Sequence, residues 1–159
     1  MSILKKSILA ITITASMAVA TTTTAQPAKS EKQANYATEI RQSVFKLLGN
    51  NMGALGAMAK GKIPVNASVA EKNAIRINQL SLMIADSMRV DTRKFKVETE
   101  ALDKVWQDPE HFSQAIKKLN VASSALITAA KTKNEGAIKK AIGGVGKTCG
   151  GCHDDFKED

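Results

Sequence analysis

The chain has 159 residues, with 23 Lys and Arg against 15 Asp and Glu, a net charge of +8, three Pro and 4% aromatic residues. This length suits one domain, with or without a processed segment. Runs of β-branched and aromatic residues bounded by turns, which predict strands, are sparse. Ala, Leu, Lys, Gln, Met and Glu, which favour helices, dominate. The composition argues against an all-β or doubly wound fold and predicts a small all-α protein.

The beginning of the chain is typical of a secretory signal peptide. A positive stretch with two Lys precedes an uncharged apolar run over residues 8–20. This run is shorter than the roughly 20 residues that span a bilayer. Cleavage after Ala20 or Ala25 fits the pattern, and an uncleaved anchor is the alternative. We predict cleavage after Ala25, which leaves 26–159 as one domain with a net charge of +6 in the periplasm, without a membrane segment.

The first half of this domain predicts two amphipathic helices. One covers residues 31–58 and ends before Gly61 and Pro64, and the next begins near Ser68, a suitable N-cap. The apolar stripe of the first consists of Ile40, Val44, Leu47, Leu48, Met52 and Leu55. The stripe of the second consists of Val69, Ile77, Leu80, Ile84 and Met88, widened by Ile75 and Leu82. Such spacings of three and four residues are typical of helices that bury one face.

The second half predicts two further helices after a charged connection. Residues 89–107 are expected to form this connection, with room for a short helix. Asp108 and Pro109 suit the N-cap and first position of the third helix, and the fourth runs from Asn134 to about Phe156. The third helix presents Phe112, Ile116, Leu119, Ser123, Leu126 and Ala130 on one face, and the fourth presents Ile138, Ile142, Val145, Cys149, Cys152 and Phe156.

Four such helices are predicted to form an antiparallel, up-down-up-down four-helix bundle, because none can bury its apolar face alone. The core is poor in large side chains. The fourth helix carries Gly143, Gly144, Gly146, Gly150 and Gly151. Each glycine inside a helix costs about 0.5–1 kcal/mol relative to alanine. We interpret these small residues as room for a bulky apolar cofactor.

The motif whose side chains can bind a cofactor is Cys149-Gly150-Gly151-Cys152-His153. It has the C-x-x-C-H spacing of c-type haem attachment. Residues three and four apart share a helix face, so both thiols and the imidazole can address one flat ligand. The thiols can form thioethers with porphyrin vinyl groups, and His153 can bind the iron. One covalently attached haem c is therefore predicted.

Other interpretations of the cysteine pair remain. A zinc site normally needs four ligands, and His111 is the one other histidine. A thioredoxin-like dithiol normally lies near the start of a βαβ unit. In an oxidising compartment the pair could also form a disulfide, and a chance match is the last alternative.

The position of the motif near the carboxyl end separates this chain from the commonest small cytochromes c, in which it lies near the amino end. A motif on the last helix of a bundle resembles the cytochrome c′ family, and the resemblance covers essentially the whole predicted domain. The matching segments are Ile40-Arg41-Gln42-Ser43 with Phe45, Met52-Gly53-Ala54-Leu55, Val105-Trp106-Gln107-Asp108 with Phe112, and Val145-Gly146-Lys147-Thr148 before the motif.

The resemblance implies a role for each matching residue. It makes Cys149 and Cys152 the thioether cysteines and His153 the axial ligand of the iron. It places Arg41 beside the haem propionates, where charge pairing is physically sensible, with a solvated surface charge as the alternative. It places Phe45 over the open side of the iron, with ordinary core packing as the alternative. Because phenylalanine has no ligating atom, His153 is expected to be the sole protein ligand.

Three further residues have weaker predictions. Lys157 stands where many family members have a basic residue near the proximal haem face, and a terminal surface charge is the alternative. Met52, two turns after Phe45, is expected to pack in the core, although its thioether could reach the iron as a sixth ligand. His111 is expected to be exposed and not to bind the iron.

A five-coordinate, high-spin iron under an aromatic side chain is expected to bind small diatomic gases, chiefly nitric oxide and also carbon monoxide. The predicted function is NO binding, detoxification or buffering in the periplasm. The alternative is an electron carrier between periplasmic redox partners, which a Met/His-ligated iron would favour. An enzyme is not predicted, because no distal His–Arg pair is visible for peroxide cleavage.

The charge pattern indicates which binding partners to expect. No basic cluster with interleaved aromatics predicts nucleic-acid binding. The lysine pairs Lys117-Lys118 and Lys139-Lys140 could steer an acidic redox partner, or could simply aid solubility. The family resemblance implies a homodimer that forms through the first two helices.

Overall fold

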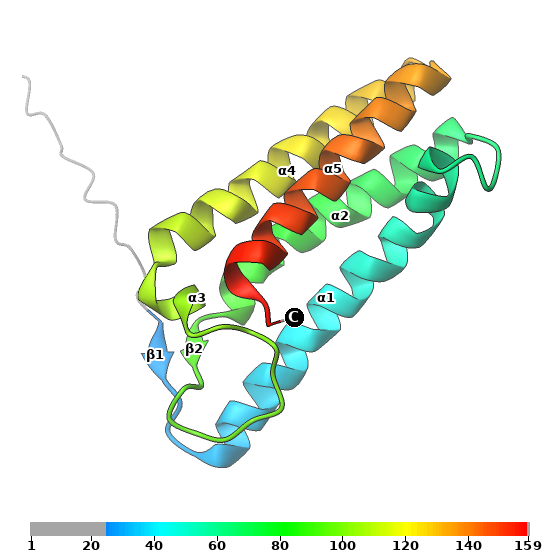
Figure 1. Cartoon of the computed structure of the whole chain (residues 1–159). Helices are drawn as coiled ribbons and strands as arrows, with labels where there is room; N and C mark the ends of the chain where they lie inside the picture. The colour runs from blue at the N-terminus through cyan, green and yellow to red at the C-terminus, as the bar shows by residue number, and fades with distance from the viewer. Residues whose placement is uncertain (1–24, 159) are drawn as a thin grey trace, which may run out of the picture.

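The computed structural model describes residues 25–158 and contains five helices in that range. Figure 1 shows them as α1 (Glu31–Ala59), α2 (Ala67–Ser87), the single turn α3 (Lys104–Gln107), α4 (Pro109–Lys131) and α5 (Glu135–Phe156). Two short strands, β1 (Gln26–Pro27) and β2 (Val90–Asp91), pair in parallel. The predicted signal peptide lies outside the described residues except for Ala25, so its cleavage remains a prediction.

Each long helix begins at a side chain that caps its first turn. The Asp108 carboxylate accepts from the His111 N–H at 3.1 Å, and the Asn134 carbonyl accepts from the Ala137 N–H at 2.8 Å. Asp108 was predicted as a cap, and Asn134 was predicted as the start of the fourth helix. The prediction of Ser68 as a cap is wrong, because the side chain of Asn66 already accepts the Val69 N–H at 3.0 Å and starts α2 there.

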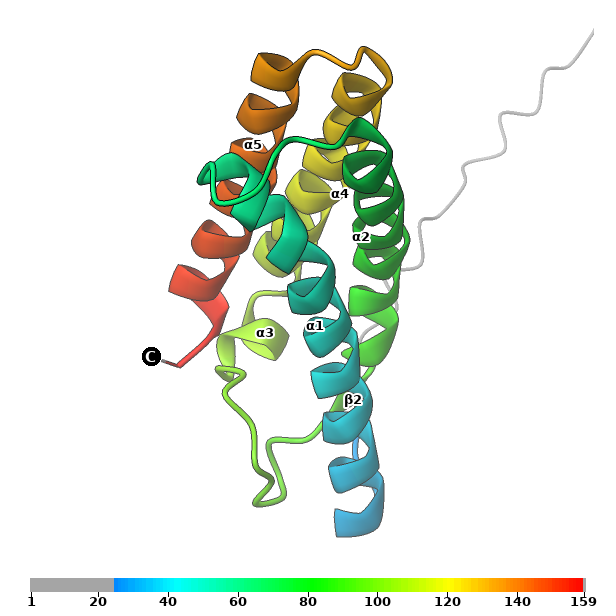
Figure 2. The same ribbon diagram turned by 90° about the vertical axis from the view of Figure 1, so that its right-hand side faces the viewer.

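The four long helices form the predicted antiparallel bundle. In chain order, α1 packs on α2, α2 on α4 and α4 on α5, and α5 also contacts α1 (Figure 2). The connection from β2 to α3 crosses one end of the bundle, beside the carboxyl end of α5. Within residues 25–158 no helix is long and apolar enough to cross a membrane.

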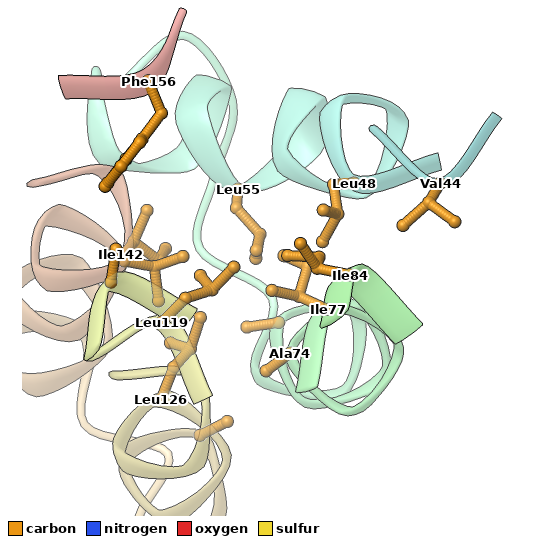
Figure 3. Close-up of a cluster of buried hydrophobic side chains, with 14 of the residues drawn as sticks. Val44, Leu48, Leu55, Ala74, Ile77, Ile84, Leu119, Leu126, Ile142 and Phe156 are labelled. Carbon is orange, nitrogen blue, oxygen red and sulfur yellow. The ribbon is translucent and has the colours of Figure 1, made fainter. Parts of the chain in front are cut away.

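The core runs along the bundle axis and draws on all four long helices (Figure 3). The predicted stripe residues Leu55, Ile77, Leu126, Ile138 and Val145 are fully buried. Other predicted members of these stripes are exposed: Ile40, Leu47, Ile75 and Leu82. The apolar stripes are wider than the seam that a bundle buries, so residues at their edges remain outside the core.

The five glycines of α5 do not all line the space that a cofactor could occupy. Gly146 lines the cavity described below, but the other four are absent from its wall. A Cβ added at Gly143, Gly144, Gly150 or Gly151 would meet open space within 4 Å. The interpretation of these glycines as room for a bulky group is therefore supported at Gly146 and not at the others.

Replacing Gly144 by Ala is expected to stabilise the holoprotein by about 0.5–1 kcal/mol, because alanine has the higher helix propensity and its methyl group has room. Thermal unfolding followed by circular dichroism should show a melting temperature raised by about 2–8 °C. Gly61→Ala is the matched control. Gly61 has a φ of 69°, so alanine there should destabilise the protein. A lower melting temperature for Gly144→Ala would contradict the exposed placement of this face.

Candidate functional site

A cavity of about 850 Å³ lies at the end of the bundle that contains the carboxyl end of α5. Side chains of α1, α2, α4 and α5 line it, together with residues 98–101 of the connection. This part of the connection is fixed at both ends. The Gln42 side-chain amide donates to the Glu98 carbonyl at 2.9 Å, and the Glu158 N–H donates to the Glu100 carbonyl at 2.8 Å. The cavity is of the size that buries most of a small ligand.

All five predicted site residues line this one cavity. Arg41 and Phe45 come from α1, and Cys149, Cys152 and His153 come from the last two turns of α5. The two groups are more than one hundred positions apart in the sequence, so the fold brings them together. The helical path of α5 continues through the whole motif to Phe156, and this places both thiols and the imidazole along one wall.

The end of α5 is anchored by aromatic packing. The Phe156 ring lies edge-on to Phe112, with ring centroids 5.0 Å apart, and to His111 at 5.2 Å. Nε2 of His111 also lies 3.3 Å from an Asp155 carboxylate oxygen. His111 is half-buried rather than exposed as predicted, because it packs on Phe156, and it does not line the cavity. These contacts fix the helix turn that carries His153.

The two cysteines are free thiols in an apolar setting. Burial raises the pKa of Cys149, and burial together with the charges of Cys149 and Asp155 raises the pKa of Cys152 to about 11. Reactive dithiols depend on a lowered pKa that favours the thiolate. The setting therefore argues against a thioredoxin-like function. Among residues 25–158, no cluster of three His, Cys, Asp or Glu side chains is arranged to hold a metal ion.

Arg41 is 3% exposed, so its interpretation as a solvated surface charge is wrong. Its Nη2 donates to the Thr92 hydroxyl at 3.1 Å and more weakly to the Val90 carbonyl at 3.4 Å. Its Nε and Nη1 are buried and have no hydrogen-bond partner within residues 25–158. Burial lowers the pKa of this guanidinium and the charge of Asp91 opposes the shift, but arginine stays protonated. A buried cation with unused donors needs an anionic partner, and a haem propionate fits.

Phe45 and Met52 face the same cavity from α1. Phe45 is 37% exposed and is not part of the buried core cluster, so its alternative as an ordinary core residue is wrong. Met52 is half-buried and also packs against the core cluster. Phe45 over the iron remains a prediction, as does the expectation that Met52 does not bind it.

Lys157 lines the cavity and is not a loose terminal charge. Its Nζ lies 3.0 Å from a Glu100 carboxylate oxygen, and its backbone pairs with Ala101. The position is consistent with the predicted placement near the haem, but its charge already has a partner.

Sequence reasoning missed two residues that surround Arg41. Thr92 accepts its hydrogen bond, and the Trp106 ring centroid lies 5.1 Å from its guanidinium carbon. Both belong to the charged connection between α2 and α4, which the sequence presents mainly as a linker. The one signal was Trp106, the sole tryptophan of the chain.

The fold and the site together define a class of protein. A C-x-x-C-H motif on the last helix, a large cavity beside it and, in its wall, a buried guanidinium with two nitrogens unpartnered among the described residues fit a c-type haem in a four-helix bundle.

Comparison with known proteins gives the family. Residues 36–157 match the family model described as Cytochrome C′. The chain is 41% identical over 122 residues to cytochrome c′ of Rubrivivax gelatinosus, across 77% of this chain and 94% of that protein. The chain therefore belongs to the cytochrome c′ family.

Solved structures agree with this assignment. The crystal structure of Rubrivivax gelatinosus cytochrome c′ matches with a TM-score of 0.71 and 39% identity, across 79% of this chain and 97% of that one. Cytochrome c′ of Shewanella frigidimarina matches with a TM-score of 0.72 and 37% identity, over the same shares. A ferrous variant of Alcaligenes xylosoxidans cytochrome c′ with bound NO matches at 0.71 with 25% identity, across 79% and 96%.

Proposed function

We propose that this chain is a periplasmic protein that carries one haem c on Cys149 and Cys152 and binds nitric oxide, with carbon monoxide as a second ligand. His153 is the single protein ligand of the iron. The observation that carries this proposal is the cavity wall on α1, where Phe45, which has no ligating atom, borders the cavity that His153 borders from α5. The protein acts by reversible binding and not as an enzyme.

The haem supplies an iron that binds diatomic gases, and the residues of this chain decide which ligands reach it. The cavity wall is mainly apolar, with Leu48, Ile77 and Ile84 among its members, and so disfavours entry of anions. Two neutral donors on the α1 side are already used: the Thr38 hydroxyl donates to the Ala34 carbonyl at 3.0 Å, and the Gln42 amide donates to the Glu98 carbonyl at 2.9 Å. Because distal donors favour oxygen binding, their engagement favours NO and CO.

The binding proposal is supported by the related Alcaligenes xylosoxidans protein, whose solved structure holds NO. The direct test is titration of the ferrous holoprotein with NO, followed by electronic absorption. We expect saturation at one NO per haem and no matching complex with azide. Absence of a spectral change with NO would contradict the proposal.

Electron transfer is the second candidate function, and Met52 is the observation that favours it. Its thioether belongs to a half-buried residue in the same cavity wall, and Met/His ligation suits electron carriers. If Met52 binds the iron, Met52→Leu should change the spin state of the ferric protein. We expect no change in spin state, because Met52 packs against the core.

We also propose a homodimer that forms through α1 and α2. Large apolar side chains are exposed on both neighbouring helices: Tyr36, Ile40, Leu47, Ile75, Leu82 and Met83. A second copy can cover such surfaces in a twofold interface, in which each patch meets its equivalent. The family resemblance points to the same two helices.

The double variant Leu47→Lys/Leu82→Lys is expected to be monomeric, because it places like charges within an apolar interface. These side chains are 51% and 57% exposed, so the monomer should fold normally. Sedimentation velocity of the holoprotein would compare it with Val121→Lys, a control at an exposed apolar position on α4. A monomeric parent, or equal dissociation by the control, would contradict this interface.

A further inference from the structure

We propose that Thr92 and Trp106 are positioning residues that hold the guanidinium of Arg41 in the wall of the cavity, where its charge would act on an acidic group of the haem. The inference rests on the proposed haem site. The connection between α2 and α4 contributes no ligand to the iron. On this inference, its function is to position Arg41.

Thr92 fixes one edge of the guanidinium. It is 1% exposed and its hydroxyl accepts from Nη2 of Arg41 at 3.1 Å. The strand pair holds this part of the connection in place, because the Gln26 N–H donates to the Arg89 carbonyl and the Ala28 N–H to the Asp91 carbonyl, each at 2.8 Å. The short β1–β2 pair thus positions the residue that Arg41 contacts.

Trp106 restrains Arg41 in another way. Its ring centroid lies 5.1 Å from the Arg41 guanidinium carbon, within the range of a cation–π contact. The indole is itself anchored, because its N–H donates to the Met88 carbonyl at 3.1 Å. The same ring contacts Arg93 at 5.8 Å, and Asp91 holds Arg93 through a 2.6 Å ion pair.

Two nitrogens of the Arg41 guanidinium lack a protein acceptor among the described residues. Nε and Nη1 are buried, lie on a residue of the cavity wall and have no partner among the described residues. A carboxylate is the usual partner of a buried guanidinium whose charge is not otherwise compensated. A guanidinium held only for packing would have these donors paired or in water. The immobilised Arg41 therefore suits a haem propionate.

The expected consequence is control of the propionate's ionisation. A fixed positive charge holds a neighbouring carboxyl group in its ionised form. Other charged or titratable groups border this region and are common to all variants below: Asp91, Arg93, Lys46, Glu98, Glu100, Lys157 and His153. Freeing Arg41 should therefore move the propionate's ionisation to higher pH.

The test is the midpoint reduction potential of the holoprotein measured against pH by spectroelectrochemistry. Thr92→Val keeps the shape and removes the acceptor, so it should raise the pH of the redox-linked ionisation by an amount equivalent to about a tenfold change in the acid constant. Thr92→Ser restores the hydroxyl and should match the parent. Trp106→Leu should act as Thr92→Val does, and Trp106→Phe should have a smaller effect.

A double-mutant cycle separates positioning from a general structural effect. In an Arg41→Gln background, Thr92→Val should cause no further shift, because no guanidinium remains to be held. A shift that persists in that background, or a Thr92→Val profile identical to the parent's, would overturn the proposal. If Thr92→Val binds NO normally and has an unchanged pH profile, only the positioning role is refuted. If the parent protein does not bind NO, the proposed function is refuted.

Discussion

Replacing Phe45 by Ala in the ferrous holoprotein is expected to raise the association rate of carbon monoxide by about 10–100-fold. Phe45 borders the cavity from α1 and lies four residues after Arg41, on the same helix face. If Phe45 lies over the iron as predicted, a ligand that enters displaces this ring from apolar surroundings, at a cost of up to about 1.5–3 kcal/mol for a phenylalanine side chain. Removing a barrier of this size raises the association rate of carbon monoxide by about 10–100-fold.

The measurement is CO rebinding after flash photolysis or by stopped-flow mixing. Leu47→Ala is the matched control, because Leu47 lies on the same helix, is 51% exposed and does not line the cavity. It should leave the CO rate unchanged. Equal rates for Phe45→Ala and the parent would show that Phe45 does not limit access to the iron.

Removing the attachment sites is expected to unfold the protein. In Cys149→Ala/Cys152→Ala the haem has no covalent bond to the chain, and the cavity of about 850 Å³ would lose its occupant. At about 24 cal/mol per Å³, such a cavity would cost on the order of 20 kcal/mol if it persisted. Water can fill part of this open cavity, so the figure is an upper limit. It is nevertheless comparable with the roughly 5–15 kcal/mol that stabilises a typical domain, so we expect the apo chain to lose this geometry.

Circular dichroism should therefore show reduced helicity and no cooperative thermal transition for the double cysteine variant. The parent holoprotein and the single variants Cys149→Ala and Cys152→Ala are the controls, because each single variant keeps one thioether site. Acid extraction should release any haem that the double variant retains and none from the parent. A double variant that melts cooperatively close to the parent would contradict the structural role of the bound group.

Local rules accounted for most of the fold. The caps at Asp108 and Asn134 and the ends of the long helices depend on neighbouring residues, and the sequence displays them directly. Ser68 was chosen wrongly as a cap, since both Asn66 and Ser68 have suitable side chains and position alone separates them. The exposed Ile40 and Leu47 show that a periodic stripe predicts an apolar face but not its buried width.

The site likewise combines features that local sequence predicts with contacts that depend on the whole fold. The spacing of Cys149, Cys152 and His153 is local and predicted their common wall on α5. The surroundings of Arg41 could not be derived, because Thr92 is 51 positions away along the chain. No local pattern specifies that contact, which depends on how the connection crosses the end of the bundle. The same holds for the wall formed by residues 98–101.

We propose that the protein binds the haem iron from one side only, through His153. Electron paramagnetic resonance of the ferric holoprotein tests it most directly, because the spectrum distinguishes high-spin from low-spin iron. We predict an axial high-spin signal that Met52→Leu leaves unchanged and that His153→Ala alters. A rhombic low-spin signal from the parent, converted to high spin by Met52→Leu, would show that a side chain caps the other side and would contradict the claim.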